Sequence, residues 1–188
     1  MKKQMGKRFV IFALLMLFCV GSVCGCAESA VHEGFYEADT QNADFSMYIP
    51  NDWETTYTEA VVTASSKDHS ASISMMVAAN PTASSGDEPK HPIDLYWESY
   101  EDTFRSTFPD LEYTVKGEET TLGGEPAKRY EYKATVAGTP YRFEQIVSVK
   151  GTLLSGAQMY IFTFAALDEQ YDTYYNTIQE CISYVKLK

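Results

Sequence analysis

The sequence has little cysteine where it is expected to fold. Its four Cys residues are Cys19, Cys24, Cys26 and Cys181, and the first three lie at the end of an N-terminal apolar segment. Beyond residue 43 only the Cys181 thiol remains, which excludes an intrachain disulfide. A domain of about 145 residues is large enough to be stable by its apolar core alone. We expect Cys181 to be a buried structural thiol on the last helix, the usual place of a free cysteine.

Histidine is also scarce, and recognisable catalytic motifs are missing. His32, His69 and His91 are far apart, and no His or Cys pair has the spacing of zinc ligands. The sequence contains no Gly-x-Ser-x-Gly nucleophile motif and no EF-hand pattern, and Gly123-Gly124 leads into a strand rather than into a helix that could bind phosphate. We therefore expect no catalytic residues, no cofactor and no resident metal.

Carboxylates cluster in two places, at Glu98, Glu101 and Asp102 and again at Glu118 and Glu119. A glycosidase needs two carboxyl groups facing one cleft. The outer face of a helix is normally acidic for solubility, which favours a solvated surface at the first group. A hydrolase remains the third alternative for the function.

Basic residues are few as well, with 15 Lys+Arg against 26 Asp+Glu and a net charge of −11. Four of the basic residues lie in the first eight positions, so removal of residues 1–25 leaves 15 − 4 = 11 and a net charge of 11 − 26 = −15. A surface of that sign repels nucleic acid and anionic headgroups. We expect neither as a direct partner.

Residues 1–25 have the organisation of a signal peptide. Met1 to Arg8 is basic and Phe9 to Val20 is almost entirely apolar, shorter than the roughly 20 residues that span a bilayer. The sequence Val23-Cys24-Gly25-Cys26 that follows resembles the lipobox of bacterial lipoproteins, although Cys24 stands where Ala or Ser is commoner. The resemblance implies cleavage before Cys26 and lipidation of its sulfur, and hence a protein held to the outer face of a membrane of the bacterial cell envelope.

Beyond the lipobox, residues 26–43 are predicted to be the lipidated cysteine and a flexible tether, with Phe35 and Tyr36 able to dock on a single α+β domain that occupies residues 44–188. Apolar periodicity and turn residues predict its elements. Strands are expected at 44–49, 57–64, 70–78, 112–121, 128–136, 141–150 and 158–165, and helices at 92–107 and at about 169–185. The strand at 158–165 is apolar on both faces and is expected in the middle of the sheet. Asp168 is expected to cap the last helix.

Several signatures resemble the PsbP-like family over residues 44–186. These are Phe45-Ser46-Met47-Tyr48-Ile49-Pro50 with Trp53, the turn Leu122-Gly123-Gly124-Glu125-Pro126-Ala127, and the closing strand around Phe162 with the helix after it. The resemblance implies a twisted, mainly antiparallel sheet of about six to seven strands with two main helices packed on it. It also implies accessory or assembly roles rather than an enzymatic activity.

The preferred function is therefore a non-catalytic, lipid-anchored accessory protein that binds a protein partner at the membrane surface. The alternative is a module that binds a small ligand or Ca²⁺ through the polar loop at residues 80–91. Most of the 14 tyrosines are expected in the core. A tentative binding surface comprises Trp53, Asp87, Glu88, His91, Tyr96 and Tyr175.

Overall fold

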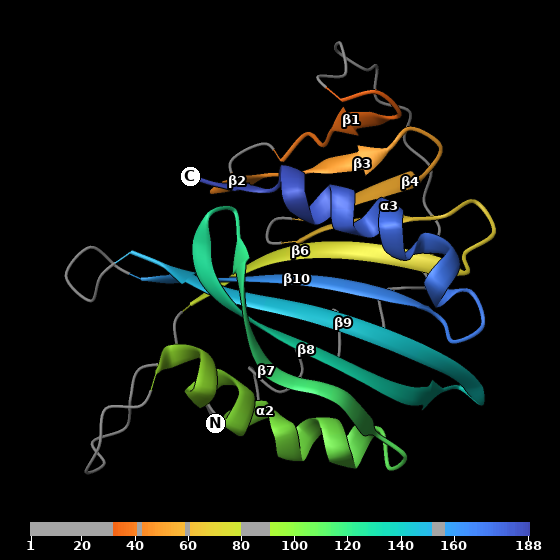
Figure 1. The fold of residues 1–188 in the computed structure, drawn as a ribbon, viewed down its shortest axis with the longest axis vertical. Helices are drawn as coiled ribbons and strands as arrows, with labels where there is room; N and C mark the ends of the chain where they lie inside the picture. Colours follow the sequence, from red (N-terminus) through yellow and green to blue (C-terminus); the bar gives the residue numbers. More distant parts are fainter. Residues whose placement is uncertain (1–31, 41–42, 59–60, 80–90, 152–156) are drawn as a thin grey trace.

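The computed structural model describes residues 32–40, 43–58, 61–79, 91–151 and 157–188. Their main feature is a seven-stranded antiparallel sheet in the order β4-β5-β6-β10-β9-β8-β7 (Figure 1). Its strands are β4 (Glu54–Thr58), β5 (Val61–Ser65), β6 (Ala71–Ala79), β7 (Glu112–Leu122), β8 (Glu125–Val136), β9 (Thr139–Lys150) and β10 (Gln158–Leu167). The predicted α+β fold class is confirmed.

Two helices cover opposite faces of this sheet, each over a different half. Along β10, Phe162 and Phe164 point into a core beneath α3 (Tyr171–Tyr184), whereas Met159 and Ile161 point into a second core beneath α2 (Pro92–Thr107). Side chains alternate between faces along a strand, so one apolar strand serves both cores. Figure 1 shows α3 over the β6–β10 half and α2 at the opposite end of the molecule, beside β7 and β8.

Strand β10 is central, as its apolar sequence predicted. It pairs with β6 from Gln158 to Ala166 and with β9 from Gln158 to Leu167. The helix expected at 92–107 has these bounds, and His91 is its N-cap, with Nδ1 accepting a hydrogen bond from the Ile93 amide at 3.4 Å. None of the helices in the described residues is both long enough and apolar enough to cross a bilayer.

The strands expected on either side of Gly124 and of Gly138 are joined as hairpins. Leu122 pairs with Glu125, and Val136 pairs with Thr139, which leaves two residues in each turn. Both central residues of each turn have positive φ, as the tightest hairpin turns require. Ala137 adopts φ 50° without being glycine, and Gly138 follows it with φ 86°.

Both ends of the domain add short strands to one end of the molecule. β1 (Phe35–Glu37) pairs with β3 (Tyr48–Pro50), and β2 (Phe45–Ser46) pairs with β11 (Lys186–Leu187). The single strand expected at 44–49 is therefore interrupted at Met47, whose carbonyl accepts a hydrogen bond from the Ala38 amide at 2.9 Å. The expected tether also ends earlier than predicted, because residues 35–37 already form a strand and Phe35 is buried.

Two further expectations were wrong. The strand expected at 57–64 is divided between two strands, β4 and β5, in which Thr58 pairs with Val61. The sequence did not predict this division because the two intervening residues include no Gly, Pro or Asn that would indicate a turn. Asp168 does not cap α3, whose N-cap is Gln170 and has no side-chain cap. The Asp168 carboxylate instead binds the Lys133 ammonium, with 2.8 Å between Oδ1 and Nζ.

Gly123 and Gly124 provide a matched test of the turn at 122–125. A Cβ at Gly123 would lie 2.7 Å from Leu187 Cγ and 3.0 Å from Leu187 N, whereas a Cβ at Gly124 would meet nothing within 4 Å. Both residues have positive φ, so both substitutions carry a backbone cost of about 1–2 kcal/mol. Gly123→Ala should cost roughly 1–3 kcal/mol more by displacing β11. Urea unfolding followed by circular dichroism measures this difference, and equal losses for the two variants would contradict the assigned contact.

Candidate functional site

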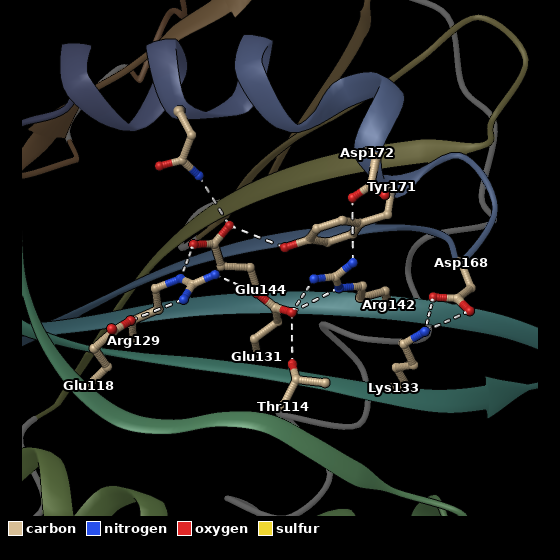
Figure 2. Close-up of polar contacts among 11 residues, drawn as sticks. Thr114, Glu118, Arg129, Glu131, Lys133, Arg142, Glu144, Asp168, Tyr171 and Asp172 are labelled. Carbon is tan, nitrogen blue, oxygen red and sulfur yellow. Dashed lines mark hydrogen bonds and ion pairs between the residues drawn. The ribbon is translucent and has the colours of Figure 1, made fainter.

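A cluster of charged side chains lies on the face of β8 and β9 that looks toward α3. Tyr130, Tyr132 and Phe143 of these strands point to the α2 side, so the alternating residues between and beside them point to the other face. We call this cluster the charged face, and it comprises Thr114, Glu118, Arg129, Glu131, Arg142 and Glu144. Figure 2 shows these residues converging from β7, β8 and β9 beneath the start of α3.

Two buried carboxylates lie side by side at its centre. Glu131 and Glu144 are directly opposite each other across the β8–β9 pair, and they are 3% and 1% exposed. Like charges in that position destabilise a sheet, so each carboxylate needs its own cation. Arg129 Nε donates to Glu144 Oε1 at 2.6 Å and also binds Glu131, while Arg142 Nε donates to Glu131 Oε1 at 2.8 Å.

Helix α3 is fastened to the same cluster. The Tyr171 hydroxyl donates to Glu144 Oε2 at 3.4 Å, and Gln179 Nε2 donates to the same oxygen at 3.2 Å. The Arg142 guanidinium carbon lies 4.1 Å from the centre of the Tyr171 ring, where it makes a cation–π contact. The charged face therefore ties the β8–β9 half of the sheet to a helix that covers mainly the other half.

The surroundings of Glu131 favour the ionised form of its carboxyl. Burial by itself raises the pKa of the Glu131 carboxyl, but the hydrogen bonds from Thr114 and Arg142 and the charges of the two guanidinium groups outweigh it. The pKa of Glu131 is consequently held below its ordinary value. A glycosidase acid needs a raised pKa, so Glu131 does not suit the role of a general acid.

The edge of the charged face is open to solvent. The Arg129 and Arg142 side chains are 18% and 25% exposed, the Glu118 side chain is 59% exposed and the Asp172 side chain, on α3, is 89% exposed. Asp172 Oδ1 lies 3.5 Å from Arg142 Nη1, and Glu118 Oε2 lies 3.0 Å from Arg129 Nη1. The face thus has an internally neutralised centre and an acidic, accessible rim.

The structure does not gather the residues of the tentative binding surface. Trp53 is 7% exposed in the α3-side core, and Tyr96 is 4% exposed in the α2-side core. Both rings were expected on the surface, and both are buried. His91 caps α2, and Tyr175 is half-buried on α3 with its ring 6.0 Å from that of Tyr171. The helix flank of Tyr96 is buried because Trp97, Tyr100 and Tyr96 pack together.

The remaining candidates have different outcomes. Asp87 and Glu88, and the lipobox residues Val23, Cys24, Gly25 and Cys26, lie outside the described residues. Within the described ranges no group of three His, Cys, Asp or Glu side chains could hold a metal ion. Cys181 is buried, and burial raises the pKa of its thiol to about 12, so the expected structural thiol is confirmed.

Sequence reasoning missed the charged face, because the charged residues of these strands were recognised only as alternating with the apolar ones. The available signal was the charge pattern. Arg129, Glu131 and Lys133 alternate in sign on one face of their strand, and Arg142 and Glu144 do the same on the next. Two strands paired in a hairpin bring such charges into contact.

Outside the charged face, Asp68 in the turn between β5 and β6 gives a pH-dependent test of the fold. Ser66 Oγ donates to Asp68 at 2.6 Å, Ser70 N at 3.1 Å, Ser70 Oγ at 2.8 Å and Tyr174 OH at 3.3 Å. These hydrogen bonds, that from Ser66 above all, lower the pKa of Asp68 from 3.8 to about 2.

Folding lowers the pKa of Asp68. The stability that its ionised carboxylate contributes is therefore complete when the pH is above the ordinary pKa, and it is lost as the pH falls through the pKa of the folded protein. We expect the carboxyl carbon of Asp68 to titrate near pH 2 by NMR, and stability to decline as pH falls between 3.8 and about 2. Asp68→Asn should show a smaller decline over that interval. An unchanged decline in the variant would contradict the assignment.

Comparisons with known proteins show the fold. No known protein family and no curated protein sequence matches the chain. Cyanobacterial PsbP (CyanoP) from Synechocystis sp. PCC 6803 superposes with a TM-score of 0.59 at 13% identity, covering 90% of this chain and 99% of that one. The Ran-binding protein Mog1p of Saccharomyces cerevisiae superposes with a TM-score of 0.51 at 8% identity, covering 81% and 95%. The predicted PsbP-like fold is thereby confirmed.

Proposed function

We propose that this PsbP-like domain is a non-catalytic accessory protein, lipid-anchored at Cys26 on the outer face of a bacterial membrane, that binds a protein partner through the charged face. The observation that carries the proposal is the mutual neutralisation of Glu131, Glu144, Arg129 and Arg142. These buried ion pairs hold β8, β9 and α3 in one arrangement, so the exposed carboxylates at the rim are presented in fixed positions.

The comparisons support a binding role. One neighbour of similar fold is described as a Ran-binding protein, so this architecture binds a protein partner in at least one setting. The other is a cyanobacterial PsbP, and the family resemblance implies accessory and assembly roles. The lipobox supports the location at the membrane surface.

The rim of the charged face indicates the chemistry of the partner. Glu118 and Asp172 are its most exposed carboxylates, and the whole chain is acidic. A partner with lysine or arginine side chains would reach these carboxylates at the edge, where charge pairs speed association and select the partner. The rigid sheet beneath them would hold the surface in one shape.

A position-specific cross-linking experiment tests this function in intact cells. A photoreactive amino acid replaces Asp172 on the rim of the charged face, and the control replaces Asp102, which is exposed on the outer side of α2. We expect one membrane protein to be captured from position 172 and not from position 102. In a protein that carries the probe at the exposed Thr114, the combined charge reversal Asp172→Lys and Glu118→Lys should lower the yield about tenfold, since two exposed charge pairs together contribute roughly 1.4 kcal/mol.

The control comparisons decide the outcome. The same adducts from positions 172 and 102, or adducts unaffected by the charge reversal, would rule out the charged face as the partner surface. Anchoring is tested separately, since the Cys26→Ala protein should leave the membrane fraction. A Cys26→Ala protein that stays with the membrane would contradict lipidation at this residue.

A further inference from the structure

The first described residue is held firmly against the domain. The His32 ring stacks on the Tyr184 ring with 3.6 Å between centroids and 11° between planes, and it meets the Tyr48 ring edge-on at 4.7 Å. Phe35 packs edge-on against the same Tyr184 at 5.5 Å. The chain is thereby fixed at the end of the molecule formed by β1, β3 and the last turn of α3, which we call the β1–β3 end (Figure 1).

Only a short connection separates this fixed point from the proposed lipid. Cys26 precedes His32 by 32 − 26 = 6 residues. Six residues span at most about 20 Å, because an extended chain advances no more than roughly 3.3–3.6 Å per residue. Whatever conformation these residues adopt, His32 cannot move farther than that from the lipidated cysteine.

The surface around this fixed point is acidic. From Phe9 to Ser66 the sequence contains no Lys or Arg, and the described part of that stretch carries six exposed acids. They are Glu33, Glu37, Asp39, Asp44, Asp52 and Glu54. Exposed Lys186 and Lys188 on and beside β11 offset two of them. The end that the tether draws toward the bilayer is thus one that anionic headgroups repel within a Debye length of about 8 Å.

Helix α2 lies at the opposite end of the long axis (Figure 1). It also carries acids, of which Glu98 and Asp102 are exposed, whereas Glu101 pairs with Arg105 and with Lys116 of β7. Tilting the domain until this helix meets an anionic membrane would bring a second acidic surface to the headgroups. Repulsion therefore opposes both close contact at one end and collapse onto the side.

We propose that the anchored domain stands on an anionic membrane with its β1–β3 end toward the bilayer and its α2 end away from it. The short tether limits the distance, and the acidic surface prevents the domain from lying flat. This inference rests on the proposed lipid anchor, and it deepens that proposal by assigning an orientation. The charged face, on β8 and β9, is then held above the membrane, where a neighbouring membrane protein could reach it.

Energy transfer to labelled lipids tests the orientation in the lipidated protein. In the mature protein the Cys26 sulfur is blocked by lipid and the Cys181 thiol is buried, so an introduced cysteine takes the label selectively. Glu33→Cys places a donor at the β1–β3 end, and Asp102→Cys places it on α2. The acceptor is a headgroup-labelled lipid in vesicles of phosphatidylglycerol. Transfer from position 33 should exceed that from position 102 by about twofold or more, because a domain of this size is ~40 Å across.

A lengthened tether is the matched control. About 20 Gly/Ser residues inserted between Ser29 and Ala30 have a root-mean-square length of ~25 Å, so transfer from position 33 should fall toward that from position 102. Equal transfer from the two positions with the native tether would overturn the proposal. Transfer from position 33 that ignores the insertion would also overturn it, since the β1–β3 end would then bind the bilayer by itself.

Flotation of the same vesicles distinguishes a failure of the proposed orientation from a failure of the proposed lipid anchor. A parent protein that does not float with the vesicles contradicts the lipid anchor and hence the proposed function. A parent protein that floats with the vesicles, but transfers energy equally from both positions, contradicts the orientation alone.

Discussion

Replacement of Glu144 by alanine should lower the free energy of unfolding by about 3 kcal/mol or more, the cost of breaking a buried ion pair from one side. The Glu144 carboxylate is 1% exposed and accepts hydrogen bonds from Arg129 at 2.6 Å, Tyr171 and Gln179. Relief of its repulsion with Glu131 would return only roughly 0.2–1 kcal/mol. The substitution leaves three hydrogen-bond donors without their acceptor, and the free energy lost in this way outweighs the relief of repulsion.

Urea unfolding followed by circular dichroism measures this effect against a control on the same network. Asp172→Ala removes a carboxylate that is 89% exposed, and its effect should stay within about 0.5 kcal/mol. Adding Arg129→Met to Glu144→Ala should cost less than the sum of the two single variants, since the pair acts as a unit. A Glu144→Ala protein as stable as Asp172→Ala would show that the charged face does not hold the sheet to α3.

Trp97→Ala is expected to cost about 3–5 kcal/mol, the range for removing a buried large aromatic side chain. Trp97 is 3% exposed and stacks on Tyr130 with 3.6 Å between centroids and 8° between planes. Its ring also packs against Phe104 and Tyr132. The substitution leaves a cavity in the α2-side core, to which Trp97 belongs.

The chain has two tryptophans, and the other one reports on the opposite core. Trp53 belongs to the α3-side core, so in Trp97→Ala its fluorescence follows that side alone. We expect the fluorescence transition to shift to lower urea together with circular dichroism, because β10 contributes to both cores. Asp102→Ala on the same helix is the control. A Trp53 transition that stays at its original midpoint would show that the two cores unfold separately.

The parts of the fold that the sequence predicted correctly are those whose signals lie within a short stretch of the chain. The strand at 158–165 is apolar on both faces, and only a central strand is buried on both. The helix at 92–107 begins with a proline in its first turn, follows a single apolar stripe and ends before Pro109, and each of these signals is local. The hairpin of β8 and β9 has alternation on both sides of a two-residue turn with glycine.

The parts that were missed depend on partners distant in the chain. Nothing within residues 45–50 indicates that one half of the segment pairs with residues 186–187 and the other half with residues 35–37. The charged face was missed for a related reason. Arg142 and Glu144 have the alternation of a solvated strand, and Glu144 is buried where Tyr171 and Gln179 of α3 donate hydrogen bonds to its carboxylate. Most of the candidate site thus depends on tertiary contacts that periodicity does not contain.

The pairing of β10 with β6 also governs when the chain can fold. Met75 pairs with Phe162, so its partner appears 162 − 75 = 87 residues later, and Phe45 waits 187 − 45 = 142 residues for Leu187. A chain that is synthesised from its N-terminus cannot complete its central strand until Leu167 has emerged, or its closing strand until Leu187 has emerged, and contacts this distant form slowly. The export that we propose would benefit from that delay, since a topology closed by such distant contacts postpones folding while the polypeptide crosses a membrane.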